Sequence, residues 1–91
     1  MVDPKTIAYM TRNEADMAFK KRVQTIFEWI PPHDDARILD CACGRGFYLN
    51  MYRHVSRCEL VGLELDADII RKAQRNVGHL PGITLTRGSI Y

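Results

Sequence analysis

The stretch DCACGRG, residues 40–46, lies between a short apolar run at 37–40 (RILD) and a segment with helical periodicity from Phe47 to about His54. Glycine at 44 and 46 lets the backbone turn tightly and lets a ligand approach without meeting a Cβ. The helix that begins near Gly46 presents free N–H groups and the positive end of its dipole, which suit a carboxylate or a phosphate. The sequence therefore predicts a ligand-binding turn between a first strand and its helix.

Two further strands and a helix follow this turn. Residues 59–64 (ELVGLE) are predicted to form a second strand, and residues 83–86 (ITLT) a third. Between them Asp66 caps a helix, and Gly78 suits the C′ position at its end. The apolar residues of that helix lie on one side of it: Ile69, Ile70, Ala73 and Val77.

Another helix is predicted ahead of the first strand. Residues 11–14 (TRNE) have capping-box spacing, and apolar residues then recur in steps of three and four as far as Ile30. Pro31 and Pro32 end this helix, which we expect from about 14 to 30. Tyr9 precedes this helix and is expected to belong to a disordered terminus, with closure over a bound ligand as the alternative.

The order helix, then strand-helix-strand-helix-strand, predicts an α/β fold with a parallel sheet and right-handed crossovers. Two crossovers in one direction place both helices on one face, whereas parallel sheets normally have both faces buried. One of Ile38 and Leu39, which alternate across the first strand, should face the uncovered side. We expect residues 1–32 to hold the N-terminal segment and leading helix, and residues 33–91 to hold an incomplete α/β domain.

The composition excludes several classes of protein. The 91 residues are 46% hydrophobic and 26% charged, which is ordinary for a soluble globular chain. No apolar run approaches the roughly 18 residues of a transmembrane helix, and no secretory signal is visible. Thirteen basic residues against eleven acidic ones give a net charge of +2, too weak to indicate nucleic acid. We therefore expect no membrane partner and no evident nucleic-acid partner.

The cysteine pattern indicates a reducing compartment and does not indicate a metal site. Cys41, Cys43 and Cys58 form an odd set without a disulfide framework, which is consistent with a reducing cytoplasm. A zinc site needs paired ligands at Cys-x-x-Cys spacing, and Cys41-x-Cys43 with His54 and Cys58 does not provide them. We predict a cytoplasmic protein without a metal, in which the cysteines pack beneath a strand end.

An acidic residue follows the glycine turn at the spacing typical of nucleotide-binding sheets. Glu64 ends the second strand eighteen residues after Gly46, where an acid binds ribose hydroxyls. A dinucleotide would place its pyrophosphate on the turn, but Leu49 replaces the third glycine of that fingerprint and Asp40 would repel the phosphates. S-adenosylmethionine would bring an ammonium and a sulfonium to Asp40 and a carboxylate to the helix N-terminus. Charge favours the sulfonium ligand, and a dinucleotide is the alternative.

Three segments resemble motifs of the class I, Rossmann-like S-adenosylmethionine-dependent methyltransferases. Residues 38–46 (ILDCACGRG) are similar to motif I, acid-x-Gly-x-Gly-x-Gly, with Ala42 in place of the first glycine. Residues 61–66 (VGLELD) look like the second motif, and residues 87–90 (RGSI) are similar to the segment after the third strand, where Ser89 replaces the usual acid that contacts adenine. The resemblance implies these cofactor-binding residues: Asp40, Ala42, Gly44, Gly46, Glu64, Leu65, Ser89 and Ile90.

The resemblance also implies a Rossmann-like three-layer fold, of which this chain would hold the first three of seven strands. It implies a methyltransferase that acts, as a complete chain, on a small-molecule acceptor, and a 91-residue piece that is inactive alone. No catalytic residue is assigned, because most of the acceptor pocket would lie outside the chain. A dinucleotide-binding half-domain and a truncated, non-catalytic interaction piece remain as alternatives. Because a sheet of only three strands would leave an edge exposed, we also expect the chain to self-associate through that edge.

Overall fold

The computed structural model describes residues 2–12 and 17–90. The chain divides into two compact units, residues 1–32 and residues 33–91. None of the described helices reaches the length and hydropathy that a bilayer crossing requires.

The N-terminal unit contains two helices, α1 (Pro4–Met10) and α2 (Met17–Trp29). The expectation of a disordered terminus is wrong, because Tyr9 lies in α1. Asp3 is the N-cap of this helix and accepts a hydrogen bond from the Lys5 N–H at 2.9 Å, and Pro4 opens its first turn. Both are favourable start signals, and Ile7 supplies the buried contact that holds so short a helix.

The second helix follows its prediction over the part that the structure describes. Helix α2 ends at Trp29, just before the two prolines, and buries Val23 and Phe27. Two residues of the predicted capping box, Asn13 and Glu14, lie outside the described residues. Whether the box forms therefore stays a prediction.

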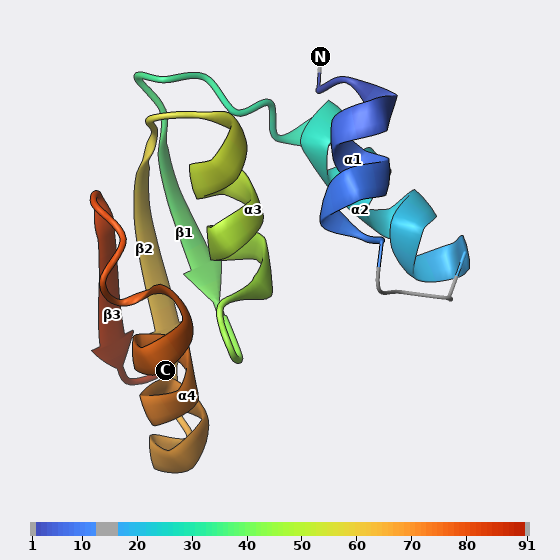
Figure 1. The fold of residues 1–91 in the computed structure, drawn as a ribbon. Coiled ribbons are helices and arrows are strands. Elements are labelled where there is room, and N and C mark those ends of the chain that lie inside the picture. The colour runs from blue at the N-terminus through green and yellow to red at the C-terminus, as the bar shows by residue number, and fades with distance from the viewer. Residues whose placement is uncertain (1, 13–16, 91) are drawn as a thin grey trace. The chain divides into compact units, whose positions relative to one another are not determined.

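The C-terminal unit is built on a parallel three-stranded sheet with strand order β1-β2-β3 (Figure 1). The strands are β1 (Arg37–Cys41), β2 (Glu59–Glu64) and β3 (Ile83–Arg87). All three agree with the predicted strands to within one residue. The α/β fold with a parallel sheet is thus confirmed.

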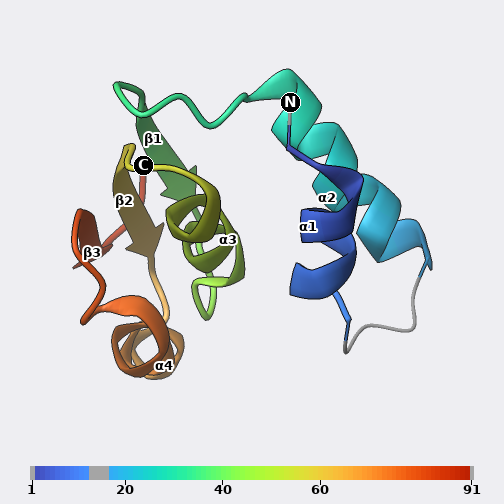
Figure 2. The same cartoon turned by 45° about the horizontal axis from the view of Figure 1, so that its top comes forward.

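Helices α3 (Phe47–Val55) and α4 (Ala67–Val77) connect the strands and lie on the same face of the sheet (Figure 2). Asp66 caps α4 as predicted, and its Oδ1 accepts hydrogen bonds from the N–H groups of Asp68 and Ile69. The prediction for Gly78 is wrong, because this residue is the C-cap with right-handed angles (φ −62°, ψ −21°) and its N–H still donates to Gln74. The buried residues of α3, β2 and α4 include Leu49, Met51, Tyr52, Leu60, Ile70, Ala73 and Val77.

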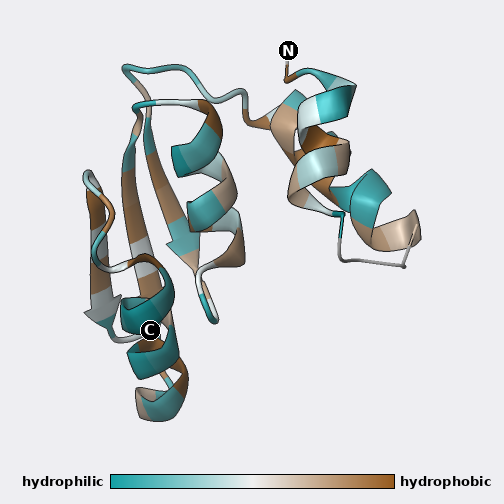
Figure 3. Ribbon diagram, viewed as in Figure 1, coloured by the Kyte–Doolittle hydropathy of each residue, from teal (hydrophilic) through white to brown (hydrophobic). Residues whose placement is uncertain are grey.

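The opposite face of the sheet carries apolar side chains without a helix of this unit over them, among the residues described. The parallel register aligns Leu39 with Val61 and Thr84 on that face. Leu39 is 56% exposed, so it is the member of the Ile38–Leu39 pair that faces the uncovered side. Figure 3 shows the hydrophobic colouring along the strands.

Candidate functional site

The turn after β1 contains three left-handed residues at alternate positions. The φ angles are +59° at Ala42, +58° at Gly44 and +89° at Gly46. A left-handed conformation costs an L-residue roughly 1–2 kcal/mol, whereas glycine adopts it freely. Ala42 therefore has the backbone conformation of a glycine and carries local strain.

Two backbone hydrogen bonds hold this turn, one to strand β2 and one within the turn itself. The Cys43 N–H donates to the Leu63 carbonyl of β2 at 2.9 Å. The Gly46 N–H donates back to the Cys43 carbonyl at 3.1 Å, and Gly46 then serves as the N-cap of α3 without a side-chain cap. Helix α3 therefore begins directly at a turn that is hydrogen-bonded to the end of β2.

Glu64 bonds to both of its neighbouring loops through separate carboxylate oxygens. Its Oε1 accepts from the Gly44 N–H at 3.1 Å, and its Oε2 accepts from the Asp66 N–H at 2.9 Å. Its main-chain carbonyl accepts from the Gly88 N–H at 3.0 Å. One residue thus links the glycine turn, the start of α4 and the segment after β3.

A hollow of about 210 Å³ opens where these three segments meet. Five of the predicted cofactor-binding residues line it: Ala42, Glu64, Leu65, Ser89 and Ile90. The lining also includes Cys41, Leu63 and Gly88, which the sequence interpretation did not select. Cys41 and Leu63 are register partners on adjacent strands, so the alternation of side chains along a strand could have identified them.

Asp40 lies one position away from this hollow and does not line it. It is the register partner of Gly62, and burial raises the pKa of its carboxyl above the ordinary value. Its Oδ2 is buried and accepts no hydrogen bond from any residue that the structure describes. A direct role for Asp40 in cofactor binding stays a prediction.

Gly44 and Gly46 serve different purposes in the turn. A Cβ on Gly44 would meet no heavy atom within 4 Å, whereas a Cβ on Gly46 would lie 2.8 Å from Cγ2 of Val77 in α4. That Gly46 also leaves room for a ligand stays a prediction. Gly46 is needed because the turn packs closely on α4, a tertiary contact that the local sequence does not reveal.

The three cysteines of this unit differ in their exposure to solvent. Cys43 is buried, and burial together with the charges of Asp40 and Glu64 raises the pKa of its thiol to about 11. Cys58 is also buried, whereas Cys41 is exposed. The prediction that the cysteines are packed inside the protein therefore holds for Cys43 and Cys58 and is wrong for Cys41. Across residues 2–12 and 17–90, no cluster of three metal-ligating side chains is found.

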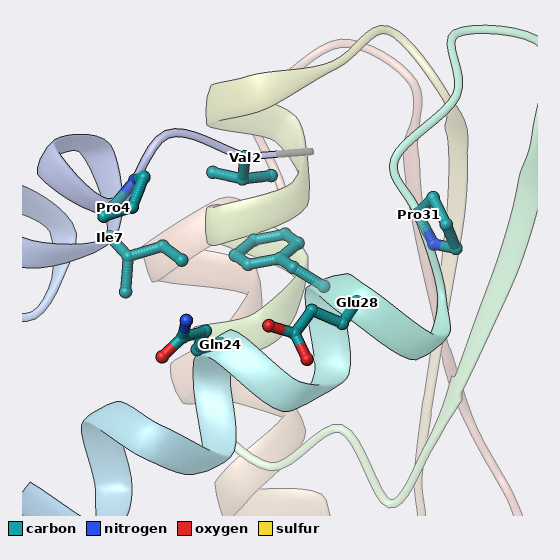
Figure 4. Close-up of a pocket in the computed structure, with 7 residues that line it drawn as sticks. Val2, Pro4, Ile7, Gln24, Glu28 and Pro31 are labelled. Atoms are coloured by element: carbon teal, nitrogen blue, oxygen red, sulfur yellow. The ribbon is translucent and has the colours of Figure 1, made fainter.

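A second hollow, of about 300 Å³, lies within the N-terminal unit (Figure 4). Its walls are mostly apolar, and Gln24 and Glu28 supply the polar groups from α2. Its lining consists of Val2, Pro4, Ile7, Gln24, Phe27, Glu28 and Pro31. None of these residues was predicted to bind a cofactor.

Solved structures resemble this chain over most of its length. An RNA methyltransferase from Salinibacter ruber, solved with S-adenosyl-L-homocysteine, aligns with a TM-score of 0.69 and 22% identity over 77% of this chain and 48% of its own. An S-adenosylmethionine-dependent methyltransferase from Mesorhizobium loti aligns with a TM-score of 0.63 and 25% identity over 79% of this chain. The chain has the fold of the class I S-adenosylmethionine-dependent methyltransferases. The predicted Rossmann-like fold and the family resemblance are confirmed.

The comparison of sequences is consistent with that fold. The chain is 29% identical over 56 residues to ribosomal RNA small subunit methyltransferase H of Thermotoga neapolitana. This alignment covers 60% of the chain and 19% of that relative. No protein-family model matches the chain. We expected no nucleic-acid partner, and this comparison does not support that expectation, because the Thermotoga relative is named as a methyltransferase of ribosomal RNA.

Proposed function

We propose that residues 33–91 form the S-adenosylmethionine-binding part of a methyltransferase, with residues 1–32 as its leading segment. The observation that carries this proposal is the Glu64 bridge between the glycine turn and α4 at the edge of a hollow. When bound, S-adenosylmethionine supplies an electrophilic methyl group on its sulfonium. The residues described here bind and orient it.

Glu64 has the capacity to hold a ribose in addition to the backbone. An ionised carboxylate has about four acceptor positions, and one N–H group from this chain occupies each Glu64 oxygen. The remaining positions are available to the two ribose hydroxyls. We propose that Glu64 is the ribose-binding residue.

The hollow beside Glu64 suits a flat, largely apolar ring. Leu65 and Ile90 are 63% and 64% exposed and line the hollow from two different segments, with Ser89 between Ile90 and the strand. Adenine would bury these side chains, and the Ser89 hydroxyl could bond to a ring nitrogen or to the amino group. We propose Leu65, Ser89 and Ile90 as the adenine-binding residues.

The charge around the turn favours a cationic ligand over a dinucleotide. Burial raises the pKa of the Cys43 thiol, and the nearby carboxylates of Asp40 and Glu64 raise it further, so both bring negative charge close to the turn. A sulfonium and an ammonium would be attracted there, whereas a pyrophosphate would be repelled. The proposal therefore places Asp40, Ala42, Gly44 and Gly46 near the methionine part of the cofactor.

Two classes of methyl acceptor are proposed. A small molecule agrees with the weak net charge of +2, and RNA is favoured by the Thermotoga relative. The assay would offer the full encoded protein labelled S-adenosylmethionine with either small ribosomal subunits or a small-molecule extract. Label in the RNA would support an RNA acceptor. Label found only in the extract would support a small-molecule acceptor.

A cytoplasmic location is part of the proposal. Its support is the set of three cysteines, all of which have free thiols in the described structure. Fractionation of cells that express a tagged full-length protein would test it. Recovery in a secreted or membrane fraction would contradict it.

Titration calorimetry tests cofactor binding directly. The full encoded protein should bind S-adenosylmethionine and S-adenosylhomocysteine, and NAD should give no heat of binding. Glu64→Ala should weaken binding, whereas Glu59→Ala, at the other end of β2 in an exposed pair with Arg37, should not. Binding of NAD without S-adenosylmethionine would overturn the proposed function.

A further inference from the structure

The last turn of α4 packs against the back of the glycine turn through two consecutive residues. The Asn76 amide nitrogen Nδ2 donates to the Arg45 carbonyl at 3.0 Å, across 31 residues of sequence. Val77 is 1% exposed and lies against Gly46, where an added Cβ would come within 2.8 Å of it. These contacts join the C-terminal end of one helix to the loop that precedes another.

Asn76 acts on the peptide unit that decides how α3 begins. The carbonyl of that unit belongs to Arg45, and its N–H belongs to Gly46, which donates to Cys43 at 3.1 Å. The carbonyl and the N–H of this peptide unit point in opposite directions, and each forms a hydrogen bond that fixes the orientation of the peptide plane. A peptide next to a glycine rotates easily, and its rotation would turn the Arg45 carbonyl toward the Cys43 carbonyl and break the Gly46 hydrogen bond that sets the start of α3.

We propose that Asn76 is a positioning residue for cofactor binding, which holds the 45–46 peptide so that the N-terminal end of α3 stays open to an anionic group. This inference rests on the proposed function. Asn76 is exposed and lines no part of the hollow, so it reaches a bound cofactor only through the turn.

A purely structural role for Asn76 makes a different prediction. An exposed hydrogen bond is readily replaced by water, so its loss should change the thermal midpoint little. If Asn76 only stabilised the packing of α4 on the turn, any loss of affinity would come with a fall in the thermal midpoint, whereas loss of a positioning residue lowers the affinity at an unchanged midpoint. Affinity and thermal midpoint measured on the same variants therefore separate the two roles.

The experiment uses the full encoded protein, S-adenosylhomocysteine as the probe, and four variants. Asn76→Ala should lower the affinity about 3- to 10-fold, the range expected when one hydrogen bond is lost. Asn76→Asp should lower it at least as much, because a carboxylate does not donate and would face the Arg45 carbonyl. Asn76→His should recover most of the affinity, because its Nδ1–H can take the place of the amide donor. Arg75→Gln, one residue earlier on the exposed surface, is the matched control and should bind like the parent.

Each outcome decides between the hypotheses. If the parent binds no S-adenosylhomocysteine, the proposed function fails. If the parent binds and Asn76→Ala binds equally well, the positioning role is wrong while the proposed function stands. If affinity and thermal midpoint fall together in Asn76→Ala and Asn76→His alike, the residue is structural. Amide exchange that becomes faster at Gly46 and Phe47 in Asn76→Ala, with β2 unchanged, would support the positioning role.

Discussion

The Glu64 carboxylate accepts a hydrogen bond from the Gly44 N–H at 3.1 Å, so a side chain at the end of β2 holds the turn that follows β1. The two residues are twenty positions apart in the sequence: Gly44 lies in the turn after β1, and Glu64 ends the adjacent parallel strand β2. The carboxyl ends of parallel strands lie at the same edge of a sheet, which brings the turn after β1 and the acid at the end of β2 together beside the hollow that Ala42 and Glu64 line. The acid is therefore part of the turn before any ligand arrives.

Glu64→Ala should weaken binding of S-adenosylmethionine about 10- to 100-fold, because hydrogen bonds to a charged group contribute roughly 1.5–3 kcal/mol. The free energy of unfolding should fall by only about 1 kcal/mol, since water can bond to the released N–H groups of Gly44 and Asp66. Titration calorimetry and urea unfolding of the full protein would measure the two effects. Unchanged affinity would remove Glu64 from the site.

Gly46→Ala should destabilise the protein by about 2–4 kcal/mol, because the methyl group overlaps Val77 and the residue must keep a φ of +89°. Gly44→Ala is the matched variant and should cost only about 1–2 kcal/mol, since its Cβ meets no atom within 4 Å. Urea unfolding of both variants would measure the difference.

A double variant tests the cause of that difference. In a Val77→Ala background, which makes room beside the turn, the Gly46→Ala change should cost about 1 kcal/mol less than in the parent. An equal cost in both backgrounds would mean that backbone strain, and not contact with α4, sets the requirement for glycine.

The thiols should react in a fixed order. Cys41 is exposed and should be alkylated by iodoacetamide at pH 8, whereas Cys43 is buried and its pKa is raised to about 11, so it should stay protected. Because the folded state raises the pKa of Cys43, its contribution to stability is present below pH 9 and should be lost as the pH rises toward 11. Mass spectrometry of tryptic peptides would locate the label, with Cys41→Ser as the control. Early modification of Cys43 in folded protein would contradict the described packing.

The sequence predicted the elements whose signals are local. Apolar runs and the Asp66 cap identified the strands and α4, because burial and capping depend on residues close together in the chain. Helix α1 was missed although Asp3 and Pro4 are good start signals, since seven residues are too few for a clear helical period. In the site, the spacing from the glycine turn identified Glu64. The sequence did not show that Ala42 adopts the left-handed backbone conformation typical of a glycine.

The contacts that the sequence could not predict are tertiary. The packing of Val77 on Gly46 and the bond from Asn76 to Arg45 join residues 31 positions apart. Neither residue of α4 differs in type from an ordinary helix residue, so only the folded arrangement reveals their part in the site. Cys41 and Leu63 line the hollow for a similar reason, because strand register determines which side chains share a face.

The 91-residue chain alone should self-associate and lack methyltransferase activity. Strand β1 pairs only with β2 within the described sheet, so its other edge offers unpaired backbone donors and acceptors. Leu39, 56% exposed, adds an apolar side chain to the face that no helix of this unit covers, among its described residues. An open apolar edge favours pairing with a second chain.

Size-exclusion chromatography with light scattering would measure the mass of the 91-residue chain across a range of concentrations. Leu39→Lys should reduce the association, because a charge on the open face opposes burial there, whereas Lys in place of the exposed Thr86 on β3 should change it less. Amide exchange would show whether β1 gains protection as the concentration rises, which pairing through its free edge requires. A monodisperse species of 10.5 kDa, with cooperative unfolding and strong protection in all three strands, would show that the sheet is stable by itself and that this prediction is wrong.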